Sequence, residues 1–280
     1  MKLCFTTLGC LDWKLDRIVQ KAVEFGYAGV DFRGLEGELD LWKICAFRDN
    51  CAQTRQRFVD AGLCVSCLSS SARMYAPPSE RFAMREELLH YIEMAHNIGA
   101  DYVRVFGGAL KGVSIDDALP AAATFLIDAA AIGREAGVEV LIETHDDWVN
   151  SAWLKAAFFE AGSPAGVGLI WDVHHPYRLG GEAPGETWAQ IGPLVKYTHW
   201  KDSKRLPAGE GSASYTLTLP GEGDLPLAQF YRLLTENGYD GWYAFEWERK
   251  WHPEIEPPEV AFPHFIDVMR KLEAEGAEQG

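Results

Sequence analysis

Residues 138–172, VEVLIETHDDWVNSAWLKAAFFEAGSPAGVGLIWD, contain one complete strand–helix–strand unit. Its two ends, VEVLIET and GVGLIWD, are nearly continuous apolar runs, which is typical of strands that are covered on both faces. The segment between them, near 150–161, is predicted to be a helix, and strands joined by a helix run parallel in one sheet. The two runs carry Glu143 and Asp172 at their ends, so the unit predicts a parallel sheet with acidic side chains at its strand ends.

The same rhythm repeats along the whole chain. Eight runs are predicted as strands, namely KLCFT (2–6), AGVDFR (28–33), LCVSCLS (63–69), DYVRVFG (101–107), VEVLIET (138–144), GVGLIWD (166–172), LVKYTHW (194–200) and GWYAFEW (241–247). The predicted helices lie near 13–25, 46–61, 81–99, from Ser114 onward, and near 150–161, 186–191, 227–238 and 257–274. Eight such units without a linker predict an α/β protein, a closed (β/α)8 TIM barrel formed by a single domain over residues 1–280. No dinucleotide-binding fingerprint follows the first strand, which disfavours an open doubly wound sheet.

One segment, residues 202–224, breaks the rhythm with the sequence DSKRLPAGEGSASYTLTLPGEGD. It holds one short alternating run, SYTLTL (214–219), and we expect a long loop after the seventh strand with a small hairpin. Long loops in compact domains are often functional. Its two Gly-Glu-Gly triplets are interpreted as turns, because no lysine follows them as in a phosphate-binding loop.

The six cysteines do not indicate a metal or redox site. Cys64 and Cys67 form a C-x-x-C, but on a strand two positions three apart point to opposite faces. No second pair follows, so all six are predicted to be buried and reduced.

The composition excludes several classes of partner. The net charge of −15 disfavours nucleic acid, whose binders usually present a basic face. No apolar run approaches the roughly 20 residues of a membrane helix. The first residues, MKLCFTTLGCLDW, lack the apolar core of a signal peptide, so we expect a cytoplasmic protein.

Four predicted strands end in metal-ligating side chains: Glu143, Asp172, His199 and Glu246. The carboxyl ends of all strands of a parallel barrel lie at one face, and these four strands are consecutive. Each residue alone is more often a helix cap, a surface charge or a hydrogen-bonded core histidine. Their joint recurrence predicts a site for one divalent cation.

The chemistry follows from the ligand types. Three carboxylates and one imidazole favour Mn²⁺, with Mg²⁺, Co²⁺ or Zn²⁺ as alternatives. Glu143 and Glu246 are predicted to flank the substrate and to remove and return a proton, while the cation stabilises the enediolate formed between the two steps.

Further side chains near these strand ends are candidates for substrate binding: His175, Lys201, Arg205, Arg33, Arg104 and Trp148. Four of them are cations on the catalytic face of an acidic protein, so we expect some to recognise an anionic or polyhydroxy substrate such as a sugar acid or sugar phosphate. The alternative is that all four pair with protein acids such as Asp31, Glu36 or Asp202 and that the substrate is a neutral ketose.

Five stretches together carry a resemblance to a known family: ETHDDW, the D-x-x-H of WDVHHP, HWKD, GEGDLPL and FEWERKWHPE. The chain resembles the xylose isomerase-like TIM barrel superfamily, and in particular its sugar phosphate isomerase/epimerase group. The resemblance implies Glu143, Asp172, His199 and Glu246 as ligands, and similarity to the ketose 3-epimerases implies Glu143 and Glu246 as the acid/base pair. It also implies His175 and Arg205 as contacts to substrate oxygens, although Lys201-Asp202 is closer to the broad isomerase/epimerase group.

The leading hypothesis is therefore a metal-dependent isomerase or epimerase of a sugar, sugar acid or sugar phosphate. The first alternative is a dehydratase of a keto-inositol or related polyol, because both reactions begin with proton abstraction beside a carbonyl. An endonuclease IV-like repair enzyme is disfavoured by the acidity and by the few histidines. A non-catalytic binding barrel does not need the two glutamates. We expect a small sugar-like ligand and no nucleic acid or membrane partner, and the sequence leaves a homo-oligomer open.

Overall fold

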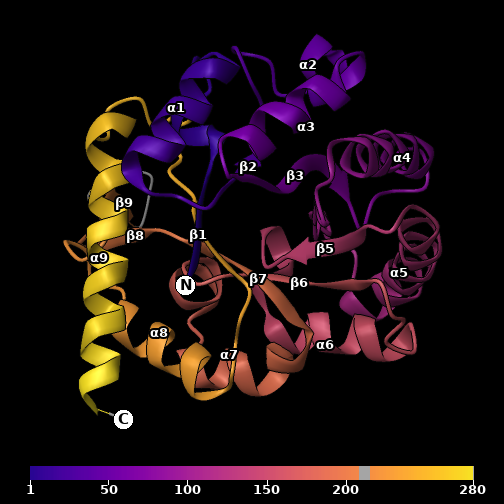
Figure 1. Ribbon diagram of the computed structural model, residues 1–280. Coiled ribbons are helices and arrows are strands. Elements are labelled where there is room, and N and C mark those ends of the chain that lie inside the picture. Colours follow the sequence, from indigo (N-terminus) through magenta and orange to yellow (C-terminus); the bar gives the residue numbers. More distant parts are fainter. Residues whose placement is uncertain (208–214, 280) are drawn as a thin grey trace.

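The computed structural model describes residues 1–207 and 215–279, with only the backbone at 277–279. Eight strands of the described part close a parallel barrel in the order β1-β10-β7-β6-β5-β4-β3-β2, with the helices packed around its outside (Figure 1). The barrel strands are β1 (Lys2–Thr6), β2 (Gly29–Phe32), β3 (Cys64–Arg73), β4 (Tyr102–Phe106), β5 (Glu139–Glu143), β6 (Val167–Asp172), β7 (Val195–Trp200) and β10 (Trp242–Phe245). The predicted (β/α)8 architecture is confirmed.

The helices alternate with these strands as the sequence pattern predicts. They are α1 (Leu15–Phe25), α2 (Cys45–Arg48), α3 (Cys51–Asp60), α4 (Arg81–Ile98), α5 (Ile115–Ala136), α6 (Ser151–Glu160), α7 (Pro184–Ile191), α8 (Leu227–Glu236) and α9 (Pro258–Gln279). Ser114 caps α5 by accepting a hydrogen bond from the amide of Asp117, and Gly137 ends this helix with a left-handed φ of 70°.

The single helix predicted near 46–61 is wrong in one respect, because it is divided into α2 and α3. Asn50 lies between them with non-helical angles of −120° and 26°. Asp49 and Asn50 are short polar residues, which compete with helical hydrogen bonds and favour helix ends.

The core has two parts that position the strands. A small cluster fills the barrel interior and includes Cys4, Cys67, Leu141, Ile170 and Tyr197. A much larger cluster lies between the strands and the surrounding helices. Burial on both sides explains why the strands are nearly continuous apolar runs, and a polar residue in such a strand must therefore have a specific partner.

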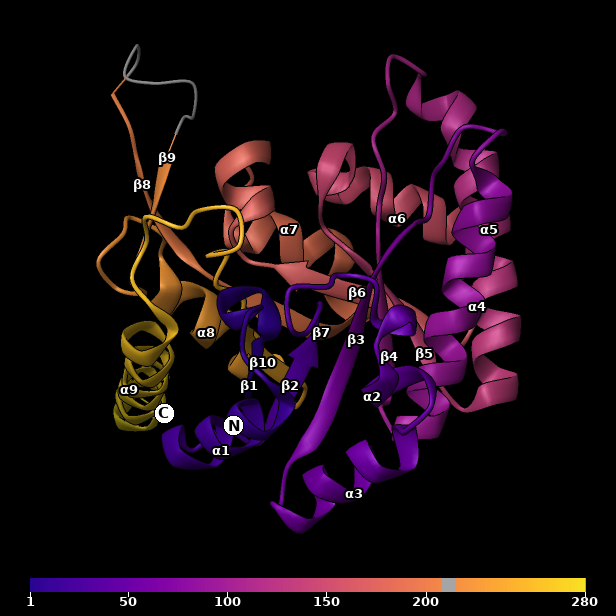
Figure 2. The same cartoon turned by 90° about the horizontal axis from the view of Figure 1, so that it is seen from above.

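The segment after β7 forms the predicted hairpin. β8 (Asp202–Arg205) pairs antiparallel with β9 (Tyr215–Thr218), and Figure 2 shows these two strands standing out from the barrel. Residues 208–214, which include Ser214 and the first Gly-Glu-Gly triplet, lie outside the described residues.

Asp202 ties the two ends of this segment together. Its Oδ1 accepts hydrogen bonds from the amides of Ser203 at 2.7 Å and Leu225 at 3.3 Å. Its Oδ2 accepts from the amides of Gly221 at 2.9 Å and Gly223 at 3.0 Å. A Cβ atom at position 223 would lie 2.0 Å from Oδ1, so this approach requires glycine.

All six cysteines are free, and Cys64 and Cys67 lie on opposite faces of β3 as predicted. The prediction that all six are buried is wrong for Cys45 and Cys64, which are exposed on the outer side of the molecule. Among the described residues, no helix combines the length and apolar character needed to cross a membrane.

We predict that Asp202→Ala lowers the free energy of unfolding by about 2 kcal/mol or more, because it leaves several amides without their charged acceptor. Urea denaturation measures this loss. Asp128→Ala, at an exposed site on α5, is the control and should stay within about 0.5 kcal/mol of the wild type. A loss at Asp202 no larger than that of the control would contradict this role.

Candidate metal centre

Four side chains predicted from the sequence converge at one end of the barrel. Glu143, Asp172, His199 and Glu246 come from β5, β6, β7 and the residue after β10, and each offers a ligand atom within 4.8 Å of the others. The Nδ1 atom of His199 lies 3.0 Å from Glu143 Oε1 and 3.4 Å from Glu246 Oε1. All four are buried, and only Glu246 has measurable exposure, at 6%. The strands carrying them are neighbours in the barrel, as predicted.

The donor set fits a divalent cation. Glu143 Oε2 is fully buried and accepts no hydrogen bond from the described residues. Buried carboxylate oxygens in native proteins normally have a partner, and a bound ion can take the place of a missing hydrogen-bond donor. Three carboxylates and an imidazole are ligands that Mn²⁺, Mg²⁺ and Zn²⁺ all accept, so these residues could hold one such ion.

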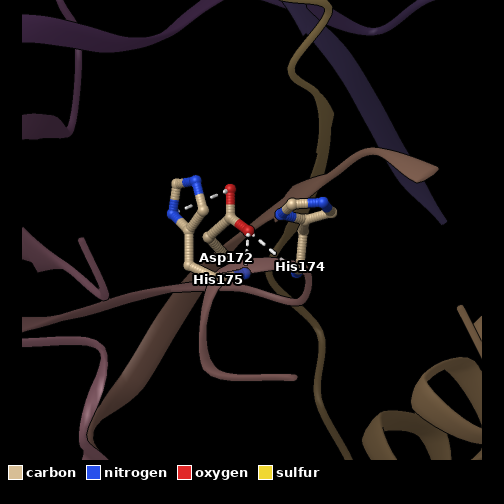
Figure 3. Close-up of side chains that lie close together, drawn as sticks. All are labelled: Asp172, His174 and His175. Atoms are coloured by element: carbon tan, nitrogen blue, oxygen red, sulfur yellow. Dashed lines mark hydrogen bonds and ion pairs between the residues drawn. The ribbon is translucent and has the colours of Figure 1, made fainter. Parts of the chain in front are cut away.

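The carboxylate of Asp172 is fixed by the turn that follows β6. Its Oδ1 accepts hydrogen bonds from the backbone amides of His174 at 2.8 Å and His175 at 2.9 Å, and Figure 3 shows the carboxylate between the two imidazole rings. Its other oxygen, Oδ2, lies 2.7 Å from Lys201 Nζ and 3.6 Å from His175 Nδ1. One oxygen is therefore held by backbone and the other faces the charged cluster.

Asp172, His174 and His175 form a second group with ligand atoms in reach of one another. His174 Nε2 lies 2.9 Å from Ser203 Oγ, and Nδ1–H of His175 donates to the carbonyl oxygen of Thr144 at 3.0 Å. Burial lowers the pKa of His174 to about 2 and that of His175 well below its usual range, so both rings are neutral. This group offers one carboxylate where the four-residue group offers three, so the four-residue group is the better candidate for a divalent cation. His175 stays a predicted substrate contact, and its neutral Nε2 can accept a hydrogen bond.

A fifth acidic residue, Asp31 on β2, was not predicted as part of the site. Its Oδ2 lies 3.3 Å from His199 Nε2, and its Oδ1 accepts a hydrogen bond from Ser69 Oγ at 2.7 Å. Asp31 is fully buried. If His199 binds a cation through Nδ1, its Nε2–H donates to Asp31, which is the usual way in which a carboxylate orients a metal-binding histidine. The sequence feature that could have indicated Asp31 is an acidic residue inside the short apolar run GVDF.

Lys201 lies inside the cluster, where its ammonium pairs with acidic side chains of the protein. Its Nζ is 2.7 Å from Asp172 Oδ2 and 2.8 Å from Glu248 Oε1, and it also pairs with Glu246. Burial works to lower the pKa of Lys201, but the carboxylates of Asp172, Glu246 and Glu248 outweigh it and hold this pKa well above its ordinary value. The ammonium therefore neutralises the cluster, and the predicted substrate contact of Lys201 stays a prediction.

The other predicted substrate residues lie in different surroundings. Arg104 is buried with Nε 3.4 Å from Glu143 Oε2, and Arg33 donates to Ser71 Oγ at 2.8 Å. Trp148 is fully buried and packs so closely on Gly107 that a Cβ there would lie 2.5 Å from the indole. Arg205 is exposed on β8, and no contact among the described residues joins its side chain to the four-residue group. The structure brings Arg104 to the cluster and does not bring Arg205 there, because the chain turns away into the hairpin.

Two more charged residues near the site were not predicted. Glu248 pairs with Lys201 two residues beyond Glu246. Arg178 is buried, donates from Nε to Ser203 Oγ at 3.0 Å and pairs with Asp224. It lies within WDVHHPYR, next to the predicted site residues, so proximity in sequence was an available signal.

The barrel architecture agrees with the comparison with known proteins. The profile of the xylose isomerase-like TIM barrel family matches residues 19–272. The chain belongs to this family. The resemblance inferred from the strand-end motifs is thereby confirmed.

Individual members of the family are more distant. An inosose dehydratase of Yersinia enterocolitica is 29% identical over 118 residues, which span 38% of this chain and 38% of that relative. The crystal structure of the IOLI protein with a bound zinc atom superposes with a TM-score of 0.79 at 17% identity and covers 100% of this chain and 99% of that one. A D-tagatose 3-epimerase-like protein gives a TM-score of 0.75 at 15% identity, with 100% and 99% coverage. At these identities the structural similarities show the fold alone.

We predict that the wild-type protein binds about one Mn²⁺ per chain and that Asp31→Asn weakens this binding about 10- to 100-fold, the usual scale for a partner of a metal-binding histidine. Isothermal titration calorimetry of chelator-treated protein measures both quantities. Asp16→Asn, on the exposed part of α1, is the matched control. Wild-type protein that binds no metal would contradict the centre itself, whereas an unchanged affinity in Asp31→Asn would contradict only the role of Asp31.

Proposed function

We propose that this protein is a divalent-metal-dependent enzyme that transfers a proton beside the carbonyl group of a sugar-like substrate, as isomerases and epimerases do. The observation that carries the proposal is the convergence of Glu143, Asp172, His199 and Glu246 within 4.8 Å of one another at one end of the barrel. This is the face at which active sites of such barrels are built.

The cation is proposed to be Mn²⁺, with Mg²⁺, Co²⁺ and Zn²⁺ as alternatives. When bound, it would stabilise negative charge that develops on the substrate oxygens. The zinc atom in the structurally similar IOLI protein supports a metal site on this fold and does not identify the metal here.

The two glutamates are suited to opposite halves of a proton transfer. Glu143 and Glu246 lie on either side of His199 Nδ1, at 3.0 Å and 3.4 Å. Burial works to raise the pKa of Glu246, but Lys201 and His199 outweigh it and hold this pKa well below its usual value. Glu246 is therefore ionised at neutral pH, which is the form that a general base requires, and Glu143 is proposed to act on the other side.

A second candidate is a dehydratase, and Lys201 is the observation that favours it. Loss of water needs a proton donor for the departing hydroxyl group, and Lys201 holds a buried proton beside Asp172 and Glu246. The curated relatives similar to this chain are inosose dehydratases, although the match spans 38% of the first of them. Both candidates share the first proton abstraction.

A small sugar-like molecule is the proposed partner in either case. The net charge of −15 disfavours nucleic acid as a binding partner. The cytoplasmic location stays a prediction, and homo-oligomer formation stays open.

We predict that Glu246→Gln lowers kcat by about 100-fold or more, the usual scale for a general acid or base. The measurement is a steady-state assay on a substrate found by screening ketoses, sugar acids, sugar phosphates and inososes. Glu236→Gln, on exposed α8, is the matched control. Near wild-type turnover by Glu246→Gln would contradict the proton-transfer role.

Mass analysis of products formed in deuterated water separates the two candidates. Isomerisation or epimerisation keeps the elemental composition, whereas dehydration loses one water. If the protein is a dehydratase, Lys201→Met should still exchange the carbon-bound hydrogen for deuterium but should form little dehydrated product. Lys196→Met, at an exposed site on β7, is the control. Full water loss by Lys201→Met would exclude Lys201 as the proton donor.

A further inference from the structure

Arg104 is a buried guanidinium with few partners. Only 2% of the residue is exposed, and its Cζ lies 3.8 Å from the centre of the Phe106 ring. Its Nε and Nη1 atoms are fully buried and donate no hydrogen bond to any described residue. Among the described residues, the acid that pairs with it is Glu143, whose Oε2 lies 3.4 Å from Nε.

This arrangement is unfavourable unless an acceptor comes from outside the chain. A buried charged donor without a hydrogen bond costs free energy, and native proteins keep such groups where they serve a ligand. The Phe106 ring covers one face of the guanidinium, so the N–H groups along the edge of the plane stay free for in-plane acceptors. Paired oxygens of a carboxylate or phosphate match that edge.

A second buried cation lies near Arg104. Arg33 follows β2, is 8% exposed, and donates to Ser71 Oγ at 2.8 Å and to the carbonyl oxygen of Leu39 at 3.5 Å. No carboxylate within 4.0 Å pairs with it in the described ranges. β3 lies between β2 and β4, and Ser70 Oγ on β3 donates to the carbonyl oxygen of Arg104 at 2.7 Å, so the two arginines flank one strand.

The two guanidinium groups repel each other. Burial lowers the pKa of Arg33, and the charge of Arg104 lowers it further. Two buried like charges with one neighbouring carboxylate, that of Glu143, favour a compensating anion.

Neither of the other two cations at the strand ends is both buried and short of acidic partners. Lys201 already contacts three carboxylates, and Arg205 is exposed on the hairpin. Of the four cations expected to recognise an anionic substrate, Arg104 and Arg33 are therefore the two that fit this role.

We propose that Arg104 and Arg33 form a subsite for an anionic oxygen group of the substrate, a carboxylate or a phosphate, next to Glu143. The inference rests on the proposed function, because the subsite lies beside the predicted metal ligands. It narrows the substrate class to sugar acids or sugar phosphates and excludes a neutral ketose.

The test compares a neutral polyol with two related anions, one a carboxylate and the other a phosphate. Calorimetry on Mn²⁺-loaded and chelator-treated protein uses D-gluconate, its neutral counterpart D-glucitol, and D-glucitol 6-phosphate. We expect at least one of the two anions to bind about tenfold or more tightly than D-glucitol, the scale of a hydrogen bond to a charged group. The anion that binds more tightly shows whether the subsite prefers a carboxylate or a phosphate. The titration of metal-free protein excludes chelation of Mn²⁺ by gluconate as the cause of tighter binding.

Variants assign the preference to the two arginines. Arg104→Met should abolish it and Arg33→Met should reduce it, while Arg57→Met, at an exposed ion pair with Asp16, should leave it unchanged. Arg104→Lys keeps the charge without the paired donors and should retain part of the preference, so it carries the test if Arg104→Met does not fold. Equal binding of the anions and D-glucitol, no binding of either anion, or an unchanged preference in Arg104→Met would overturn the subsite. Because binding is measured without turnover, this outcome is independent of whether Glu246 transfers a proton.

Discussion

Burial of negative charge at one end of the barrel is the constraint on which the site depends. Asp31, Glu143, Asp172 and Glu246 are at most 6% exposed, and isolated charges in such places are strongly unfavourable. Positively charged groups at the strand ends of the barrel offset this cost of burying negative charge. Lys201 pairs with Asp172 and Glu246, while the carboxylates around His199 raise the pKa of its imidazole well above the usual value even though burial opposes this. Opposite charges within the cluster therefore offset part of the free-energy cost of burying these carboxylates.

The sequence was sufficient for the barrel and for the four candidate ligands, for a common physical reason. In a parallel barrel every strand ends at the same face, so the position of Glu143 or His199 along its own strand already places it in space. Asp31 was missed because its partner, His199, lies across the barrel interior on a strand that is not its neighbour. Strand periodicity predicts which face a residue occupies and does not predict contacts across the interior.

Residues beyond the strand ends follow the pattern less closely. Arg205 follows β7 by five residues and was expected near the substrate, but the hairpin carries it outward. The substrate contact of Lys201 stays a prediction, and its three carboxylate partners could not be identified from the sequence, because the number of acids around one point depends on three-dimensional packing. The similarity to known structures does not settle the roles of Arg205 and Lys201. It concerns the fold, whereas the reactions that occur on this fold depend on a few side chains.

The anchoring of the hairpin by Asp202 has a consequence for the evolution of the protein. Lys201 lies in the charged cluster, and the next residue, Asp202, binds the amides of Gly221, Gly223 and Leu225, where the segment returns to the barrel. The entrance and exit of the segment are thus joined at a single carboxylate. Insertions or deletions between them can change the length and chemistry of the hairpin without displacing His199. The rim of the barrel and its charged centre can therefore evolve at separate rates.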